Sequence, residues 1–177
     1  MVRFIILTLV SSSLALNAAE PKGGRPNLLE NAAFESAMTG WTVTSHENLG
    51  KVDLDKDVKR GETPSLRITN PGASDTFCKQ IVKVKPGMRY RFTGYIKTKD
   101  VVVKGGQAAN LSLDGTYERS PSLKGSESWR KVEFEFDSGP SDTVQVGCRL
   151  GGWFSMTTGT AWFDDLKLIE IGKSRKG

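Results

Sequence analysis

The sequence predicts an all-β fold in which two antiparallel sheets pack face to face as a sandwich. Short segments alternate apolar and polar residues, so each has one inward and one outward face. Turn-forming residues separate these segments, and no segment repeats apolar residues at helical spacing. The length of 177 residues is typical of one domain. Strands with this rhythm favour a sandwich over other all-β architectures.

Residues 1–19 are expected to be a secretory signal peptide. A positive start at Met1–Arg3 precedes an apolar run at Phe4–Val10, and the small residues Ala18 and Ala19 follow. Cleavage is expected near Ala19, and the protein would then be secreted or lie in the periplasm or cell envelope. A buried N-terminal strand or helix is the alternative. The apolar run is too short to predict a membrane span, and no second run approaches that length.

The rest of the chain is predicted to be one domain with short ends. Residues 20–26 are rich in Pro and Gly and are expected to form a flexible linker. The sandwich is expected at residues 27–171, followed by a basic tail at 172–177. Its predicted strands are 65–69, 78–84, 89–97, 109–114, 130–136, 143–150 and 161–171. The turn signals between them are Asn70-Pro71-Gly72, Pro86-Gly87, Gly105-Gly106, Ser138-Gly139-Pro140 and Gly151-Gly152.

The alternation also assigns side chains to the core. The inward sets are Cys78, Val82 and Val84; Phe92, Gly94 and Ile96; Val132, Phe134 and Phe136; and Val144, Val146, Cys148 and Leu150. Both cysteines are therefore expected to face the core, and opposite sheets could carry them. The sequence leaves open whether they form a disulfide between the sheets or remain two buried thiols.

Charge and motifs exclude several classes of function. The formal charge is +5, but basic and acidic residues are interspersed, and the only basic cluster is the tail, so no nucleic-acid partner is predicted. One histidine, His46, and two cysteines are too few for a zinc site. No phosphate-binding loop or nucleophile motif is present.

A pair of carboxylates keeps one enzymatic alternative open. Glu133 and Glu135 lie two residues apart on one strand face, so their Cα atoms are about 7 Å apart. Glycosidases use two carboxylates at separations of this order. A small paired-carboxylate carbohydrate-active enzyme is therefore one alternative, although no motif accompanies the pair.

Three parts of the sequence resemble carbohydrate-binding modules of the family 4, 9 and 22 type. The first is residues 27–35 (NLLENAAFE) with Gly40-Trp41, and the second is residues 78–92 (CKQIVKVKPGMRYRF). The third comprises residues 129–131 (WRK) and 160–168 (TAWFDDLKL). The resemblance covers nearly all of residues 27–171. It implies a galactose-binding-like jelly roll that binds a poly- or oligosaccharide and does not catalyse a reaction.

The resemblance also implies a structural calcium ion near the chain ends. By position, the ligands would be Glu35 and Asp164, with Asp165 less favoured. Backbone carbonyls between Gly61 and Ser65 would complete a shell of hard oxygen ligands, which calcium prefers. The alternative is that Asp164 caps a turn and that Glu35 is solvated.

Sugar binding requires flat apolar rings and planar polar groups, and the resembling modules place these on one concave sheet or on the loops at one edge. Trp153 and Tyr117 are the predicted stacking residues, because both lie in loops. The predicted polar and aromatic partners on outward strand positions are Tyr95, Asn110, Asp114, Glu133, Glu135 and Arg149. Trp41 and Trp129 match positions of the general fold and are expected in the core. A structural or protein-interaction sandwich of the cell envelope, without sugar affinity, is the main alternative. The glycan and the oligomeric state are left open.

Overall fold

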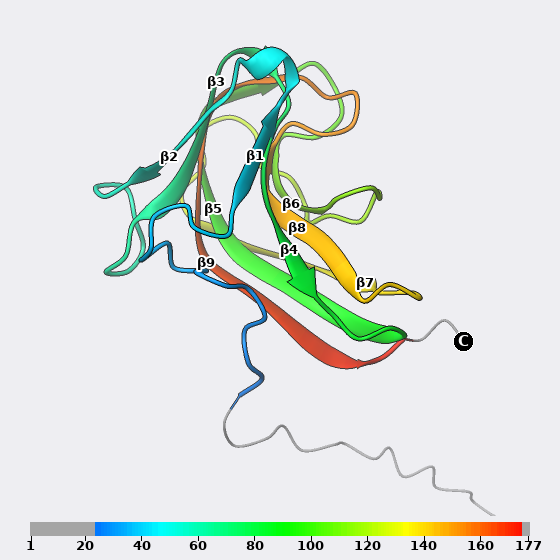
Figure 1. Ribbon diagram of the computed structural model, residues 1–177. Coiled ribbons are helices and arrows are strands. Elements are labelled where there is room, and N and C mark those ends of the chain that lie inside the picture. The colour runs from blue at the N-terminus through cyan, green and yellow to red at the C-terminus, as the bar shows by residue number, and fades with distance from the viewer. Residues whose placement is uncertain (1–23, 175–177) are drawn as a thin grey trace, which may run out of the picture.

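The structure is a computed structural model and describes residues 24–174 (Figure 1). The expected signal peptide at 1–19, most of the linker at 20–26 and the end of the basic tail lie outside the described residues. Within residues 24–174, no helix is long and apolar enough to cross a membrane.

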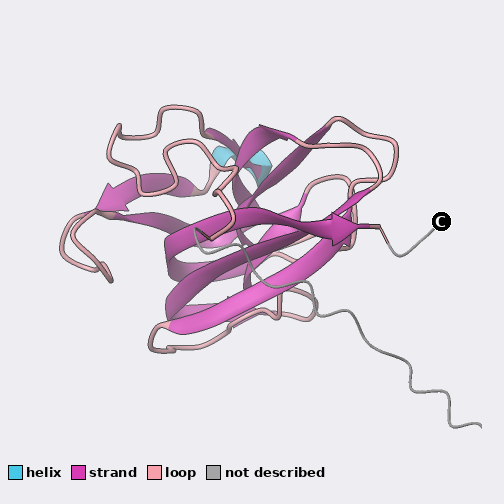
Figure 2. Ribbon diagram, turned by 90° about the horizontal axis from the view of Figure 1, so that it is seen from below, coloured by secondary structure: helices cyan, strands magenta, loops and turns pink. Residues whose placement is uncertain are grey.

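Nine strands in this part of the chain form two antiparallel sheets that pack face to face (Figures 1 and 2). The four-stranded sheet has the order β1 (Thr42–Ser45), β4 (Thr76–Lys83), β8 (Thr143–Leu150) and β6 (Ala109–Leu113). The five-stranded sheet has the order β2 (Lys51–Asp55), β3 (Ser65–Ser74), β9 (Thr157–Lys173), β5 (Met88–Val103) and β7 (Arg130–Asp137). A 3-10 turn, η1 (His46–Asn48), connects β1 to β2. From β3 onwards every connection carries the chain to the other sheet, as in a jelly roll.

The predicted sandwich, its seven strands and their inward faces are confirmed. The structure adds β1 and β2, which were not predicted because they are short edge strands whose side chains are mostly not buried. The turn predicted at Asn70-Pro71-Gly72 is wrong, because β3 continues through it. The register between β3 and β9 shifts between Asn70 and Ser74, and at such an irregularity a proline removes no required ladder hydrogen bond.

Aromatic side chains fill the centre of the sandwich. The rings of Tyr90 and Phe136 stack with centroids 5.7 Å apart, and Phe92 meets Phe134 edge-on at 5.9 Å. The buried Tyr90 hydroxyl accepts the backbone N–H of Lys85 at 2.7 Å, so its polar atom is satisfied. Trp41 is buried as predicted. Trp129 differs from the prediction: it is only partly buried, because it precedes β7 at the edge of its sheet.

The two cysteines lie on neighbouring strands of one sheet. Cys78 of β4 is the direct register partner of Cys148 of β8, so the expectation that they could bridge opposite sheets is wrong. Both thiols are free and fully buried. Burial raises the pKa of Cys78 to about 12 and also raises that of Cys148. The thiols therefore stay protonated and pack as small apolar groups.

Candidate functional site

The outer face of the four-stranded sheet is covered by paired charges. Phe77 of β4 points outward but is only 3% exposed. The guanidinium of Arg149 lies 5.1 Å and the ammonium of Lys79 5.6 Å from its ring centroid. Arg149 forms an ion pair with Asp75, and Lys79 forms one with Asp114. These contacts hold two cations over an aromatic ring and leave little of that ring accessible.

A small hollow of about 220 Å³ opens at one edge of this face. Trp153 and Tyr117 line it, with 47% and 75% of their surfaces exposed. Their ring centroids are 6.1 Å apart and the ring planes are inclined by 51°. Such paired, exposed rings offer two flat apolar surfaces to one ligand. The structure thus brings the two predicted stacking residues together from loops far apart in the sequence.

A tight turn between β8 and β9 presents Trp153. Gly152 and Ser155 exchange backbone hydrogen bonds of 3.2 and 2.9 Å, so Trp153 and Phe154 occupy the tip. Two glycines allow the close packing beneath it. A side chain at Gly151 would meet the backbone of Asp75 at 2.8 Å, and one at Gly106 would meet the hydroxyl of Ser155 at 1.8 Å. Both glycines also have positive φ, and the turn is therefore fixed against its neighbours.

A second turn, after β6, presents Tyr117. The backbone N–H of Leu113 donates to Glu118 O at 3.0 Å, and Glu118 N–H donates to the hydroxyl of Thr116 at 3.1 Å. The guanidinium of Arg119 donates to Tyr117 O at 2.8 Å. Tyr117 thus stands on a hydrogen-bonded loop, with its ring in solvent.

Two other predicted residues of this face hold neighbouring segments in place. Asn110 points outward from β6 but is fully buried. Its amide donates to Ala108 O at 2.9 Å and to Gly151 O at 3.0 Å, so it ties β6 to the turn that carries Trp153. Asp114 holds Lys79, as described above, and its backbone N–H donates to Gln145 O at 2.8 Å. Both groups position the site more than they present free polar atoms.

The remaining predicted ligand residues lie on the opposite face of the sandwich. Tyr95 of β5 and Glu133 and Glu135 of β7 belong to the five-stranded sheet. Their outward direction is as predicted, but strand alternation does not show which sheet carries them. They do not line the hollow of Trp153 and Tyr117, so the eight predicted residues do not form one site.

Glu135 is unsuited to the paired-carboxylate alternative. Its carboxylate accepts hydrogen bonds from Arg91 at 2.7 and 3.0 Å and from Arg89 at 2.9 Å. The bonds from Arg91 and then from Arg89 lower its pKa, so it stays ionised. A general acid needs a raised pKa, and this environment does the opposite.

Three residues around the turns were not predicted from the sequence. Glu118 and Arg119 line the hollow, and Phe154 stands next to Trp153 with 98% of its surface exposed. The signal for Phe154 was present in Gly151-Gly152-Trp153-Phe154, where two adjacent aromatics follow two glycines. Glu118 and Arg119 carry no local signal, because only the fold of the loop after β6 brings them to the hollow.

The two predicted calcium ligands, Glu35 and Asp164, lie in different surroundings. Among residues 24–174, no three His, Cys, Asp or Glu side chains come together as metal ligands. Glu35 is exposed. Asp164 is buried, and its two carboxylate oxygens accept the backbone N–H groups of Arg60 and Asp165, both at 2.8 Å. The pKa of Asp164 is raised above its ordinary value, because the effect of burial exceeds the opposing effect of these two hydrogen bonds.

The positively charged side chain of Arg60 lies close to this part of the chain. The Arg60 guanidinium lies 3.4 Å from the ring centroid of Tyr95, and its Nε is 2.7 Å from the carboxylate of Asp165. As placed, these side chains fit this internal cation better than a metal ion. Calcium binding by Glu35 and Asp164 stays a prediction of the resemblance.

Replacing Arg60 with Ala is expected to lower the free energy of unfolding by about 1–2 kcal/mol, because it removes the cation–π contact and the partly exposed ion pair. Urea unfolding with and without calcium measures this effect. Lys59→Ala, which removes a neighbouring exposed cation, is the matched control and should change stability little. Unchanged stability of the Arg60 variant would contradict the expected contribution of these contacts. A large calcium-dependent stabilisation of the unaltered protein would support the calcium site that the resemblance predicts.

The fold and the hollow together define a class of protein. A jelly-roll sandwich with exposed, turn-borne aromatics beside one sheet face is a scaffold for binding and shows no catalytic constellation in the described residues. Residues 26–149 match the family model of the carbohydrate binding domain of families 4 and 9. The chain belongs to this family, whose model describes a binding domain and not a catalytic one.

One curated protein and two solved structures are also similar to this chain. The tRNA(Glu)-specific nuclease WapA of Bacillus subtilis subsp. natto (strain BEST195) is 25% identical over 160 residues, a match that covers 80% of this chain and 7% of WapA. The chain thus spans only a small part of that relative. TmCBM61 in complex with β-1,4-galactotriose has a TM-score of 0.57 at 18% identity, covering 82% of this chain and 99% of that one. The CBM22-1 xylan-binding domain of Paenibacillus barcinonensis Xyn10C has a TM-score of 0.55 at 16% identity, covering 89% and 100%. At these identities, the two structures support the jelly-roll fold.

Proposed function

We propose that the protein is an exported, non-catalytic module that binds a poly- or oligosaccharide at the hollow of Trp153 and Tyr117. The observation that carries this proposal is the pair of exposed rings 6.1 Å apart at the edge of the four-stranded sheet. Export rests on the expected signal peptide at residues 1–19.

The chemistry around the rings suits a sugar. Apolar ring faces cover the C–H faces of a pyranose, and Arg119 and Glu118 offer a planar donor and a carboxylate acceptor at the same hollow. The two solved domains named above bind β-1,4-galactotriose and xylan, respectively. Galactan and xylan oligosaccharides are therefore the first ligands to test.

A glycan array and a pull-down on insoluble polysaccharides, both with the purified protein, test this function. Binding to a defined class of neutral glycan is expected, with titration calorimetry giving its affinity. A folded protein that binds no glycan would exclude the proposal and would favour a structural or protein-interaction role in the cell envelope.

Phe154 extends the proposed site over the tip of its turn. It lines a separate hollow of about 300 Å³ together with Val102 and Met156, beside the hollow that Trp153 lines. Its φ is +61°, a left-handed conformation that is uncommon for residues with a Cβ. A fully exposed phenylalanine in this conformation does not stabilise the fold, which favours a role in contacting the ligand.

Replacing Phe154 with Gly is expected to leave the melting temperature unchanged or to raise it. Relief of about 1 kcal/mol of backbone strain is offset in part by the greater freedom of glycine in the unfolded chain. The same change should weaken glycan binding several-fold, and Phe154→Tyr, which keeps the ring, should not. Unchanged affinity of the glycine variant would exclude Phe154 from the site.

A further inference from the structure

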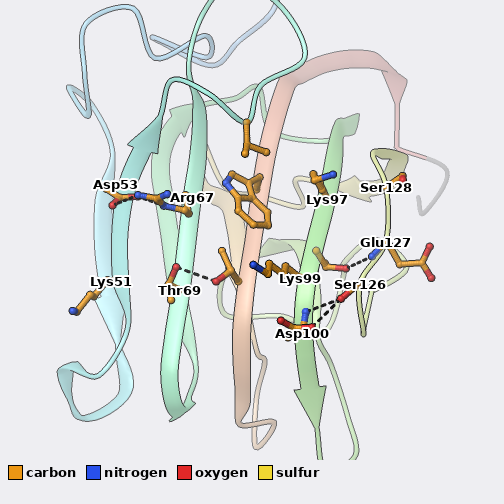
Figure 3. A pocket seen from close by; sticks show the side chains of 14 residues that line it. Lys51, Asp53, Arg67, Thr69, Lys97, Lys99, Asp100, Ser126, Glu127 and Ser128 are labelled. Carbon is orange, nitrogen blue, oxygen red and sulfur yellow. Dashed lines mark hydrogen bonds and ion pairs between the residues drawn. The ribbon is translucent and has the colours of Figure 1, made fainter.

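A larger hollow, of about 820 Å³, lies on the opposite face of the sandwich (Figure 3). It runs over the outer side of the five-stranded sheet, from β2 across β3 and β9 to β5, and the segment 126–128 closes it beyond β5. None of the residues that line it lines the hollow of Trp153 and Tyr117. It is therefore a separate surface, called the trough below, which the proposed function does not use.

Three lysines line this trough without an ion pair to any residue of the described chain. Lys51 lies at the β2 edge, and Lys97 and Lys99 both project from β5 (Figure 3). Since Lys97 and Lys99 are two residues apart on one strand, their Cα atoms are about 7 Å apart on the same face. Arg67 differs, because it donates to Asp53 at 2.7 and 2.8 Å and to Asp55 at 2.8 Å.

The acidic residues of the trough have other partners or point elsewhere. Asp53 is held by Arg67. Asp100 accepts the hydroxyl of Ser126 at 3.1 Å, at one end of the trough. Glu127 is fixed through its backbone, whose N–H lies 3.1 Å from the hydroxyl of Thr98, while its carboxylate points away from the sheet (Figure 3). Three lysines are therefore available to a ligand in the trough. Lys51 lies apart at the β2 edge, whereas Lys97 and Lys99 are neighbours on β5 (Figure 3).

The floor between the lysines carries two hydroxyl groups that offer hydrogen bonds. The hydroxyls of Thr69 and Thr160 lie 3.3 Å apart across β3 and β9. Trp162 also lines the trough, but it is only 7% exposed and its indole N–H donates to Asp55 at 2.9 Å. The trough thus has hydroxyls and ammonium groups but lacks an exposed aromatic ring among its lining residues.

We infer that this trough is a second binding site, specific for an anionic saccharide whose carboxylates pair with Lys97 and Lys99. Ammonium groups attract carboxylates, and the threonine hydroxyls can bond the hydroxyls of the sugar. A neutral glycan would find no ring to stack on, and a single-stranded nucleic acid would find no platform for its bases. Uronic-acid chains match this combination of charge and hydroxyls.

Titration of the protein with polygalacturonate oligomers and, separately, with neutral β-1,4-galactan tests the inference. Binding of the acidic oligomers is expected, with an affinity that falls as the salt concentration rises. Lys97→Gln with Lys99→Gln should weaken it tenfold or more and leave the melting temperature and any galactan binding unchanged. Lys83→Gln, which removes an exposed lysine of β4 on the other sheet, is the matched control.

Several results would overturn the inference. The protein could fail to bind acidic oligomers, or the double lysine variant could bind them as well as the unaltered protein. Loss of acidic-oligomer binding in Trp153→Ala would also contradict a separate site. Equal binding of a DNA oligonucleotide would also overturn it, because it would show unspecific attraction of polyanions. This test is independent of the proposed function. If the protein binds no neutral glycan, the effect of the double lysine variant on acidic-oligomer binding still decides the inference.

Discussion

Replacing Trp153 with Ala is expected to lower the affinity for the bound glycan about tenfold. A sugar ring that covers roughly 50 Å² of the indole face removes apolar surface from water, at about 25 cal/mol per Å², or about 1.3 kcal/mol. The same loss is expected for Tyr117→Ala. Because the two rings are 6.1 Å apart and are proposed to contact the same ligand, the double variant should show coupling rather than simple addition.

Titration calorimetry with the best glycan from the array measures these affinities. Leu49→Ala is the matched control, because it removes an apolar side chain of similar exposure, 40%, that does not line the hollow. Melting temperatures of all variants should stay close together, since both rings lie at the surface and outside the core. Unchanged affinity in the double variant would place the glycan elsewhere on the protein and would contradict the proposed site.

The fold could be predicted because sandwich strands carry their own signal. Alternation such as that of Val132, Phe134 and Phe136 identifies a strand and its buried face without knowledge of its neighbours. The same signal is weak in short edge strands, so β1 and β2 were missed. It also does not state which strands pair, and for that reason Cys78 and Cys148 were not recognised as partners in one sheet.

The site could be predicted only in part, for a related reason. Trp153 and Tyr117 stood out as aromatics in turns, and the structure brings them together. Outward position alone did not separate Glu135, which is held by two arginines, from a free carboxylate. Nor did it reveal that Asn110 is buried and bonded to the turn that carries Trp153, or that Tyr95 lies on the other sheet. These properties depend on contacts between distant segments, which local patterns do not contain.

Loss of the Asn70 side chain is expected to destabilise the fold strongly. It is buried, and its amide donates to Ser74 O at 3.0 Å, Leu150 O at 3.1 Å and the Thr157 hydroxyl at 3.1 Å. Its carbonyl accepts the Thr76 hydroxyl at 2.7 Å. One side chain thereby connects β3 and β9 of one sheet to β4 and β8 of the other.

Replacing Asn70 with Ala should lower the free energy of unfolding by roughly 3 kcal/mol, because several buried polar groups lose their partner at once. Urea unfolding measures this loss, and Thr69→Ala, at the adjacent half-buried position, is the control, with an expected loss of about 1 kcal/mol or less. Leu150 and Thr157 also flank the turn that carries Trp153, so the folded variant should bind glycan more weakly. A loss of stability below about 1 kcal/mol would show that water replaces the amide, and that the two sheets are held at this end by apolar packing alone.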